Sequence, residues 1–339
     1  MRPGCWTGGL ARRPASGFRW TVRAEVERLY RTRYGGFMAR HFHEHLVREH
    51  GFSSGYTWTK AFLQSKGLLQ RAARRGAHRR KRPRRSLPGM MLHQDGSRHA
   101  WLAGVDPLDL IVTMDDATSE SYSAFLVAEE GTASTMRALL EVLGEHGLPL
   151  SLYTDRGSHY FHTSEADRPV DRKHPTQVGR ALAQLGVEYI AAYTPQARGR
   201  SERLFQTLQD RLVKELAVAG VETVEAANRF IREVYVPRHN ARSRVQAAQE
   251  GTAFVAIPGV DLREILCIQE ERQVDRDNTV IYRRLKLQIP PPPLRPHFVK
   301  TRVKVRQYLD GSHAIFHGPR CIGRYDAGGV LLTEAKRAA

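Results

Sequence analysis

The chain has 339 residues, and its 53 Lys and Arg against 35 Asp and Glu give a formal charge of +18. Together with a sequence pI of about 10.2, this favours a polyanionic partner, nucleic acid before an anionic membrane surface. No apolar run approaches the roughly 20 residues of a membrane-spanning helix, so we expect no membrane span. The three cysteines, Cys5, Cys267 and Cys321, lie far apart, which suits a reducing cytoplasm and gives no zinc-binding spacing.

Residues 1–20 are rich in Gly, Arg and Pro, and they contain no apolar segment of the kind that a secretory signal needs. We expect this segment to be poorly structured, either as a ragged start or as the remnant of a longer N-terminal region.

Residues 21–70 predict three helices separated by short turns that contain glycine. Apolar residues recur at helical spacing in VRAEVERLYRTRY and GFMARHFHEHLVREH, and GFSSG separates these from YTWTKAFLQSKGLL. This order favours a DNA-binding helix-turn-helix, with Thr57, Lys60, Gln64 and Ser65 as the polar residues that would touch DNA. A three-helix bundle with a solvated face is an equally good interpretation of these residues alone.

A basic linker is expected at residues 71–87. Nine of the fifteen residues in RAARRGAHRRKRPRR are Arg or Lys and none is acidic, so the run cannot fold on itself. Its natural use is contact with phosphates, here through Arg79, Arg80, Lys81 and Arg82. The alternatives are a solvated linker or, in a eukaryotic host, a localisation signal.

Residues 88–250 alternate strand and helix patterns and predict an α/β core. Three strand candidates come first, MMLHQDGS, DLIVTMDDATS and YSAFLVAEE. A helix, a strand, a second helix, a fifth strand and a third helix follow in TASTMRALLEVLGEHG, LPLSLYTD, PTQVGRALAQLG, VEYIAAY and the segment after YTPQARGRS. Residues 255–335 then predict short β segments.

The C-terminal β segments favour a small β-barrel with one basic face. Arg302, Lys304 and Arg306 alternate with Val303 and Val305 in TRVKVRQ, so the basic side chains share one side of a strand. We expect this side to contact DNA, and a barrel that merely stabilises the protein is the alternative.

Three acidic residues stand at element boundaries of the core. Asp95 closes the first strand, Asp155 closes the fourth, and Glu202 opens the helix after the fifth. The carboxyl ends of strands are where α/β sheets gather functional groups. Carboxylate oxygens are the ligands that Mg²⁺ and Mn²⁺ prefer, and two such ions could cleave a phosphodiester.

Each of these acids also has a structural interpretation. Asp115 and Asp116 follow a strand in MDDATS and rival Asp95, although an Asp there can also cap a turn. Asp155 could be a turn residue, and a Glu near position 202 is favoured by the helix dipole in any protein. The dipole disfavours the neighbouring Arg198, Arg200 and Arg203, which we expect to meet the DNA backbone beside the scissile phosphate.

The segments LHQDGS, MDDATS, LYTDRGS, LGVEYI and TPQARGRSERLFQTLQDRLVKEL resemble the DDE transposases of insertion sequences, which have a retroviral-integrase-like core, and most of all the ISNCY-like group. The resemblance covers roughly residues 36–335. It implies an RNase H-like core, an N-terminal helix-turn-helix and a C-terminal β domain, with Asp95, Asp155 and Glu202 as the catalytic and metal-binding triad.

The resemblance also implies an activity. A DDE transposase is a polynucleotidyl transferase that uses Mg²⁺ or Mn²⁺, with two ions expected here. It hydrolyses a phosphodiester at the end of a DNA element and transfers that end into target DNA. The expected partner is double-stranded DNA, and the protein is expected to form a homo-oligomer. Its expected location is the bacterial cytoplasm, at the nucleoid when DNA is bound.

The sequence departs from the family pattern in three places. Between Asp155 and Glu202 lie 46 residues, a longer gap than in many integrase-like cores. Many relatives carry Lys or Arg seven residues after the Glu, whereas this chain has Gln209, so Arg203 or Arg211 would contact the DNA instead. The family's N-terminal part is longer, so a catalytically inactive or truncated DNA-binding protein is one rival. A metal-dependent nuclease on the same fold is the other, although it would need neither a helix-turn-helix nor a basic β domain.

Overall fold

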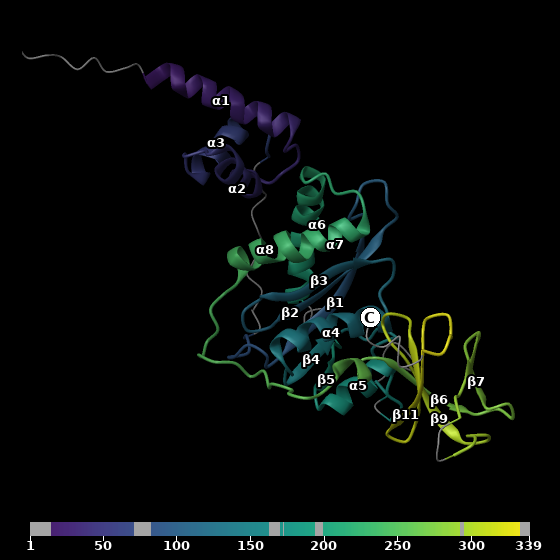
Figure 1. The fold of residues 1–339 in the computed structure, drawn as a ribbon. Coiled ribbons are helices and arrows are strands. Elements are labelled where there is room, and N and C mark those ends of the chain that lie inside the picture. Colours follow the sequence, from purple (N-terminus) through teal and green to yellow (C-terminus); the bar gives the residue numbers. More distant parts are fainter. Residues whose placement is uncertain are drawn as a thin grey trace, which may run out of the picture. The chain divides into compact units, whose positions relative to one another are not determined.

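The computed structural model describes residues 15–70, 83–162, 170–171, 173–193, 199–291 and 295–332, with backbone alone for 15–21. The chain divides into a helical unit, residues 1–81 with 218–220, and a larger unit, residues 82–217 with 221–339 (Figure 1). The expected contacts of Arg79, Arg80, Lys81, Arg82 and Arg198 with DNA lie outside the described residues.

The helical unit contains the three expected helices, α1 (Ala15–Thr32), α2 (Ala39–His50) and α3 (Tyr56–Ser65). The aromatic and aliphatic residues that recur at helical spacing pack together in one core, in which Phe42 is fully buried. Helix α2 ends at Gly51, whose φ of 60° closes the last turn in the left-handed region that favours glycine.

The larger unit is built on a mixed five-stranded sheet in the order β3-β2-β1-β4-β5. Strands β1 and β2, and β2 and β3, are antiparallel, whereas β1 and β4, and β4 and β5, are parallel. The strands are β1 (Leu92–His99), β2 (Leu108–Asp115), β3 (Ser121–Val127), β4 (Ser151–Thr154) and β5 (Glu188–Ala191). This arrangement agrees with the α/β layer order expected from the sequence.

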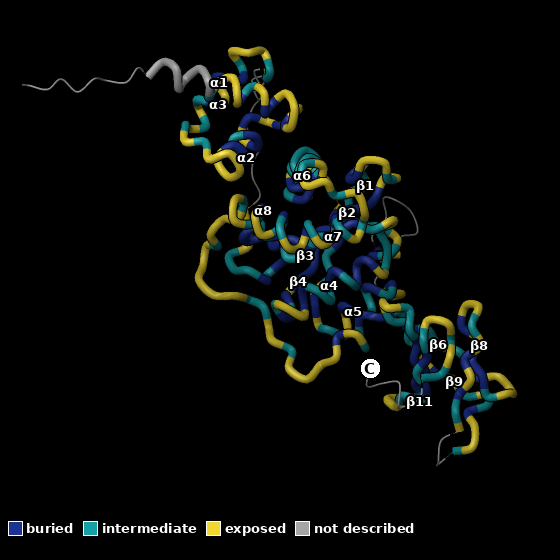
Figure 2. The backbone as a smooth tube through the Cα atoms, turned by 45° about the horizontal axis from the view of Figure 1, so that its top comes forward, coloured by how far each residue is buried: buried dark blue, intermediate teal, exposed yellow. Residues whose placement is uncertain are grey.

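Helices cover both faces of this sheet. Every residue of β2 is buried (Figure 2), because its side chains alternate between two cores. Leu110 packs with the helices that follow β5, whereas Ile111 packs with Ala138 of the helix that follows β3. The helices are α4 (Thr132–His146), α5 (Gln177–Leu185), α6 (Gly199–Val218), α7 (Val224–Phe230) and α8 (Val236–Ser243), with a π-helical turn at Ile231–Tyr235.

The C-terminal segment forms two antiparallel sheets, and the small β-barrel predicted for it is not confirmed. A four-stranded sheet has the order β11-β10-β9-β6, and β7 and β8 pair as a separate hairpin. The strands are β6 (Ile268–Gln273), β7 (Thr279–Tyr282), β8 (Leu285–Gln288), β9 (Arg302–Gln307), β10 (His313–His317) and β11 (Arg320–Tyr325), after a short 3₁₀ turn at Leu262–Glu264. The two sheets share one apolar core, so side-chain packing, without a ladder between the described strands of the two sheets, joins them.

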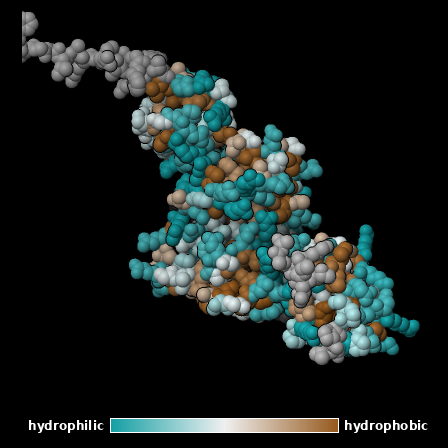
Figure 3. All heavy atoms as spheres, in the orientation of Figure 1, coloured by the Kyte–Doolittle hydropathy of each residue, from teal (hydrophilic) through white to brown (hydrophobic). Residues whose placement is uncertain are grey.

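This C-terminal segment is attached to α5 by paired backbone contacts. The side-chain amide of Gln177 donates to the carbonyl of Gln269 at 2.8 Å and accepts from its N–H at 3.0 Å. Arg180 donates to the carbonyls of Ile265 and Cys267 at 3.0 and 2.6 Å. The outer surface over these strands is largely hydrophilic (Figure 3).

Candidate active site

Asp95 does not close its strand as predicted, because β1 continues to His99 and Asp95 lies in its middle. Asp155 directly follows β4, the parallel neighbour of β1. The register pairs Leu92 with Leu152 and His93 with Tyr153, so two further residues along each strand bring Asp95 level with Asp155. Asp95 is buried, with 7% of its surface exposed. The two inner strands therefore place these two predicted ligands side by side.

Both carboxylates also hold their local turns. Asp95 Oδ1 accepts the N–H of Gly96 at 3.1 Å, and Asp155 Oδ1 accepts the N–H of Gly157 at 2.9 Å. One oxygen of Asp155 therefore has the turn-stabilising role that the structural interpretation predicted. A carboxylate has two oxygens and about four acceptor positions, so the turn contact and a ligand role are compatible.

Helix α6 lies along the face of β1 that carries Asp95. His93, Asp95 and Ser97 point to the same side of the strand because side chains alternate. At one end of this row, Asp116 binds both His93 and Arg200 of α6. At the other end, Gln209 Nε2 donates to Ser97 Oγ at 3.0 Å. The helix therefore runs in the same direction as β1.

These contacts fix the level of Glu202. It precedes Gln209 by seven residues, so the two share one side of the helix about 10 Å apart. About three residues of a strand span the same length. Three residues before Ser97, the strand reaches Gln94, next to Asp95. Glu202 lies in the first turn of α6 and is exposed. Its carboxylate is thus level with Asp95 on an accessible side of the helix.

The three carboxylates do not form a closed cluster. In the larger unit, no three described His, Cys, Asp or Glu residues place ligand atoms within 4.8 Å of one another. Asp95 and Asp155 are fixed by the strands and their turn hydrogen bonds, whereas Glu202 has an exposed side chain. Of these three carboxylates, Glu202 is therefore the one on an exposed side chain.

Asp115 and Asp116 lie at the opposite end of β1, since Leu92 pairs with Asp115. Asp115 Oδ1 accepts the N–H of Gly89 at 2.9 Å, and its Oδ2 accepts the N–H and hydroxyl of Thr118 at 2.8 and 3.0 Å. Both aspartates are fully buried. These contacts support the turn interpretation of MDDATS and leave Asp95 as the aspartate beside Asp155.

Asp116 is ionised in this environment. Burial by itself would raise the pKa of its carboxyl group, but hydrogen bonds from His93, the N–H of Arg85 and the guanidinium of Arg200 outweigh burial. The pKa therefore lies well below its usual value. The charge is held in place for the surrounding cations and not for a metal ion.

Arg200, which we expected at the DNA backbone, is engaged inside the protein. Its guanidinium donates to the carboxylate of Asp116 and, at 3.0 Å, to the carbonyl of Pro83. Its side chain is only 19% exposed. Arg203, three residues along the helix, is exposed, and Arg211 is partly buried. Arg203 is therefore the described arginine of this group that best suits phosphate contact.

The basic side of β9 is divided in the same way. Val303 and Val305 are buried, and Arg302 and Lys304 are exposed, as the alternation predicts. Arg306 instead lies 2.5 Å from Glu264 and stacks over the ring of Phe316. Its charge is balanced inside the β domain, so only Arg302 and Lys304 remain candidates for DNA contact on this strand.

In the helical unit, the polar residues expected to touch DNA lie together. Thr57, Lys60 and Ser65 are exposed and Gln64 is partly buried, while Phe62 and Leu63 face the core. A third-helix surface of this kind fits either interpretation of the segment, the helix-turn-helix or the solvated bundle.

The chain is similar to transposases. It is 30% identical over 294 residues to a protein of Sinorhizobium fredii, y4bF, that is described provisionally as a transposase; the match covers 86% of this chain and 64% of that protein. It is 35% identical over 150 residues to the transposase for insertion sequence IS1202 of Streptococcus pneumoniae, covering 44% of this chain and 32% of that one. The chain thus spans less than two thirds of the length of these curated relatives. No protein-family model matches it.

Among solved structures, the chain is similar to viral integrases. The HTLV-2 integrase catalytic core in complex with magnesium aligns with 44% of this chain and 91% of its own, at 17% identity and a TM-score of 0.33. The simian T-cell lymphotropic virus intasome in complex with PP2A regulatory subunit B56 gamma aligns with 90% of this chain and 97% of its own, at 14% identity and a TM-score of 0.36.

One group beside the aspartates was missed by the sequence analysis. Glu130 lies against Gly96 on the other face of β1, where it accepts the hydroxyl of Tyr160 at 3.3 Å and lies 3.5 Å from His159 Nε2. The sequence analysis placed Glu130 at the end of the strand candidate YSAFLVAEE and gave it no role. The available signal was Gly96 itself, since glycine within a strand often marks a close approach of another group.

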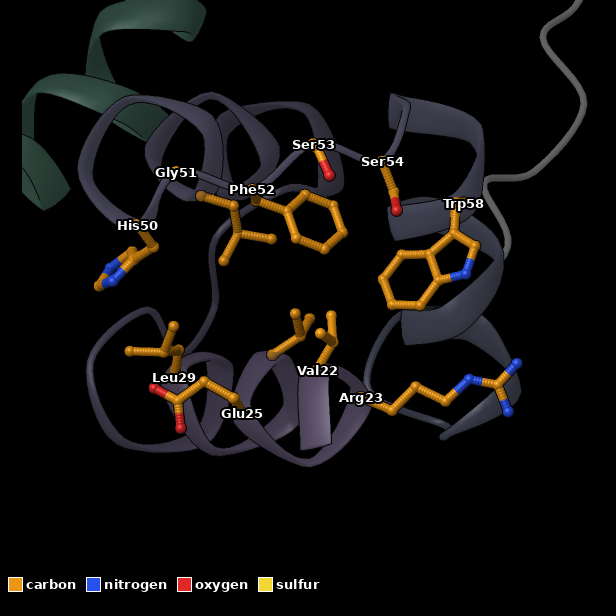
Figure 4. A pocket seen from close by; sticks show the side chains of 12 residues that line it. Val22, Arg23, Glu25, Leu29, His50, Gly51, Phe52, Ser53, Ser54 and Trp58 are labelled. Carbon is orange, nitrogen blue, oxygen red and sulfur yellow. The ribbon is translucent and has the colours of Figure 1, made fainter. Parts of the chain in front are cut away.

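A cavity of about 760 Å³ lies within the helical unit (Figure 4). Val22, Leu29, Phe52 and Trp58 line it, and its carboxylate, Glu25, is paired with Arg28 at 2.6 Å. Arg23, His50, Ser53 and Ser54 also line it, so the cavity is mixed in polarity, and Glu25 is the one carboxylate among its described lining residues. No described helix is both long and apolar enough to cross a bilayer.

Proposed function

We propose that the chain is a DDE-type transposase of the ISNCY-like group, with an RNase H-like, integrase-like core. The observation that carries the proposal is the register that brings Asp95 of β1 beside Asp155, which follows β4, with Glu202 level with them on α6. The similarity to two transposases supports it from the sequence.

The three proposed ligands are of the kind that binds divalent cations. Asp95, Asp155 and Glu202 offer only carboxylate oxygens, the donors that Mg²⁺ and Mn²⁺ prefer. We propose that they hold two such ions, which would activate the attacking oxygen and stabilise the charge on the phosphate. Asp95 and Asp155 provide the rigid part of the site, and Glu202 completes it from the helix.

The proposed reaction has two steps on DNA. Water cleaves a phosphodiester at the end of the element and leaves a 3′-hydroxyl. That hydroxyl then attacks a phosphodiester of the target in line, so that one P–O bond forms as another breaks. No covalent bond between enzyme and DNA is needed. Because two ends must be joined to one target, we expect a homo-oligomer.

Double-stranded DNA, as element ends and as target, is the proposed partner. Lys60 and Gln64 on α3, Arg203 on α6, and Arg302 and Lys304 on β9 are the described residues proposed to bind it. The proposed location is the bacterial cytoplasm, at the nucleoid when the protein is bound to DNA.

The test uses DNA that spans the two genomic flanks of the coding region, incubated with the protein and Mg²⁺ or Mn²⁺. The proposal predicts nicked and joined products with wild-type protein and neither with Glu202→Gln. Nicking without joining would instead identify a metal-dependent nuclease. DNA binding without metal-dependent chemistry would identify an inactive or truncated DNA-binding protein, the rival that the open arrangement of the three carboxylates favours.

A further inference from the structure

Asp116 connects three separate segments of the larger unit. Its Oδ1 lies 2.7 Å from His93 Nε2 of β1 and binds the guanidinium of Arg200 at the start of α6. Its Oδ2 accepts the N–H of Arg85 at 2.8 Å. One buried carboxylate thus joins the sheet, the first turn of α6 and the segment that follows the basic run.

Backbone carbonyls strengthen the same junction. Arg200 donates to the carbonyl of Pro83 at 3.0 Å, and Arg84 donates to the carbonyl of Asp116 at 2.9 Å and to Ser119 Oγ at 2.7 Å. Two arginines from distant parts of the chain therefore meet at the loop that follows β2. Their guanidinium groups are planar donors suited to fixed, multiple hydrogen bonds.

The charges make the junction dependent on Asp116. The pKa of Arg84 lies below its ordinary value. Burial is the largest cause and the nearby charge of Arg200 adds to it, whereas the charges of Asp116 and Asp115 act in the opposite direction. Arg84 and Arg200 therefore repel each other, and the aspartates offset this repulsion. Without the charge of Asp116, the repulsion between the exposed Arg84 and the partly buried Arg200 would no longer be offset, which favours separation of their segments.

This junction lies two residues before Glu202. Helix α6 begins at Gly199, so Arg200 is in its first turn and contacts Asp116, which also binds His93 of the sheet. Farther along the helix, Gln209 binds Ser97. The contact of Arg200 with Asp116 and the contact of Gln209 with Ser97 therefore flank the stretch of helix that carries Glu202.

We propose that the Asp116–Arg200 ion pair is a positioning clamp that holds Glu202 level with Asp95. This inference rests on the proposed function of the carboxylates. Arg200 acts through Glu202 and does not touch DNA, in contrast to Arg203 on the exposed side of the same turn. The clamp also ties the end of the basic run to the helix that carries the third metal ligand.

The test compares Arg200→Ala with its exposed neighbour Arg203→Ala. Binding of Mn²⁺ to the protein is measured by calorimetry, and DNA affinity is measured without metal. Arg200→Ala is expected to weaken Mn²⁺ binding and metal-dependent cleavage by roughly 10- to 100-fold and to leave metal-free DNA affinity within about twofold of the wild type. Arg203→Ala is expected to show the reverse pattern, since phosphate contacts set DNA affinity.

Asp116→Asn provides the second variant, because it removes the charge and keeps the shape of the partner. It should weaken Mn²⁺ binding as Arg200→Ala does and increase hydrogen exchange of the amides in residues 199–204. If Arg200→Ala fails to fold, Arg200→Lys takes its place; it keeps the charge but loses the fork of donors, and an intermediate loss of Mn²⁺ affinity is expected.

Either of two results would overturn the clamp: unchanged Mn²⁺ binding in both clamp variants, or loss of metal-free DNA affinity in Arg200→Ala equal to that in Arg203→Ala. Failure of the proposed function gives a different result. Wild-type protein would then bind Mn²⁺ without cleaving DNA, and the Glu202→Gln variant would not bind Mn²⁺. The effect of Arg200→Ala on Mn²⁺ binding would still decide whether the clamp exists.

Discussion

At the scale of single residues, Gly96 limits what can surround Asp95. A Cβ added to Gly96 would lie 2.2 Å from Oε2 and 2.6 Å from Cδ of Glu130. Glu130 could move only by giving up its contacts with Tyr160 and His159. The absence of a side chain at Gly96 thus lets a second carboxylate approach the strand that carries Asp95.

Gly96→Ala is therefore expected to displace the end of β1 and to lower metal-dependent cleavage by about 10²-fold, the scale of loss from a displacement near 1 Å. The same substitution in a Glu130→Ala background should cost much less, because the obstructing carboxylate is gone. Cleavage rates of the four proteins form a double-mutant cycle. An equal loss in both backgrounds would show that Glu130 is not the obstacle.

At the scale of elements, two asparagines cover the exposed edge of the sheet. The amide of Asn228 on α7 accepts from the N–H of Leu126 at 2.6 Å and donates to its carbonyl at 3.0 Å. Asn240 on α8 binds Ser121 in the same way, at 2.9 and 2.8 Å. Each amide imitates the backbone of a neighbouring strand, which protects edge strand β3 from pairing with another chain.

Asn228→Leu should leave the N–H and C=O of Leu126 unpaired and lower the free energy of unfolding by about 1–3 kcal/mol. Asn240→Leu should do the same, and the two losses should add because the sites are about 17 Å apart along β3. Urea denaturation measures both, with the exposed neighbour Arg229→Ala as control. A loss no larger than that of the control would mean that water replaces the amides at no cost.

Helix α8 also predicts a dependence of stability on pH. Burial first, and then the charges of Arg242 and Arg211, lower the pKa of His239 to about 4. The folded state keeps this imidazole neutral, whereas the unfolded chain takes up a proton near the ordinary value of 6.5. His239 therefore contributes a loss of stability as the pH falls below 6.5, about 3 kcal/mol at most by pH 4. In the His239→Gln variant, the denaturation midpoint should change less with pH over that range. If it changed with pH as much as in the wild type, His239 would not be the group responsible.

The elements show what local pattern could and could not predict. The carboxyl end of β4 could be predicted, because an Asp follows an apolar run in LYTDRGS. The same pattern in LHQDGS was misleading, because β1 continues past Asp95 to His99. The contact of Arg200 could not be predicted, because its partner Asp116 lies 84 residues away in the chain. One local signal did exist. Arg200 precedes the buried Leu204 by four residues, so it continues the buried side of α6, whereas Arg203 does not.

The β domain shows the same limit. Period-2 alternation correctly separated Val303 and Val305 from the basic side of β9. Alternation has no information about Glu264, 42 residues before Arg306, which binds that arginine. The predicted barrel is not confirmed, and alternation could not decide it, because pairing between distant strands, and not the strand pattern itself, decides whether a sheet closes.

At the scale of the whole molecule, the charge of +18 overstates the charge available to the proposed DNA partner. Arg200 and Arg306 are each balanced by a carboxylate of the protein, so in the proposed complex they would release no counterions from DNA. Arg302 and Lys304 are exposed on the same strand as Arg306. A matched pair of variants on β9 can therefore separate charge that binds DNA from charge that stabilises the fold.

Lys304→Gln should weaken DNA binding at every sequence and reduce the slope of log affinity against log salt by about 0.9, the value for one phosphate contact. Its melting temperature should hardly change, because the side chain is exposed. Arg306→Gln should leave that slope unchanged and lower the melting temperature, because Glu264 then loses a partner. Fluorescence titration at several salt concentrations and thermal denaturation measure the two effects. If Arg306→Gln reduced the salt slope as Lys304→Gln does, Arg306 would have to leave Glu264 for the phosphate, and the division between the two kinds of charge would fail.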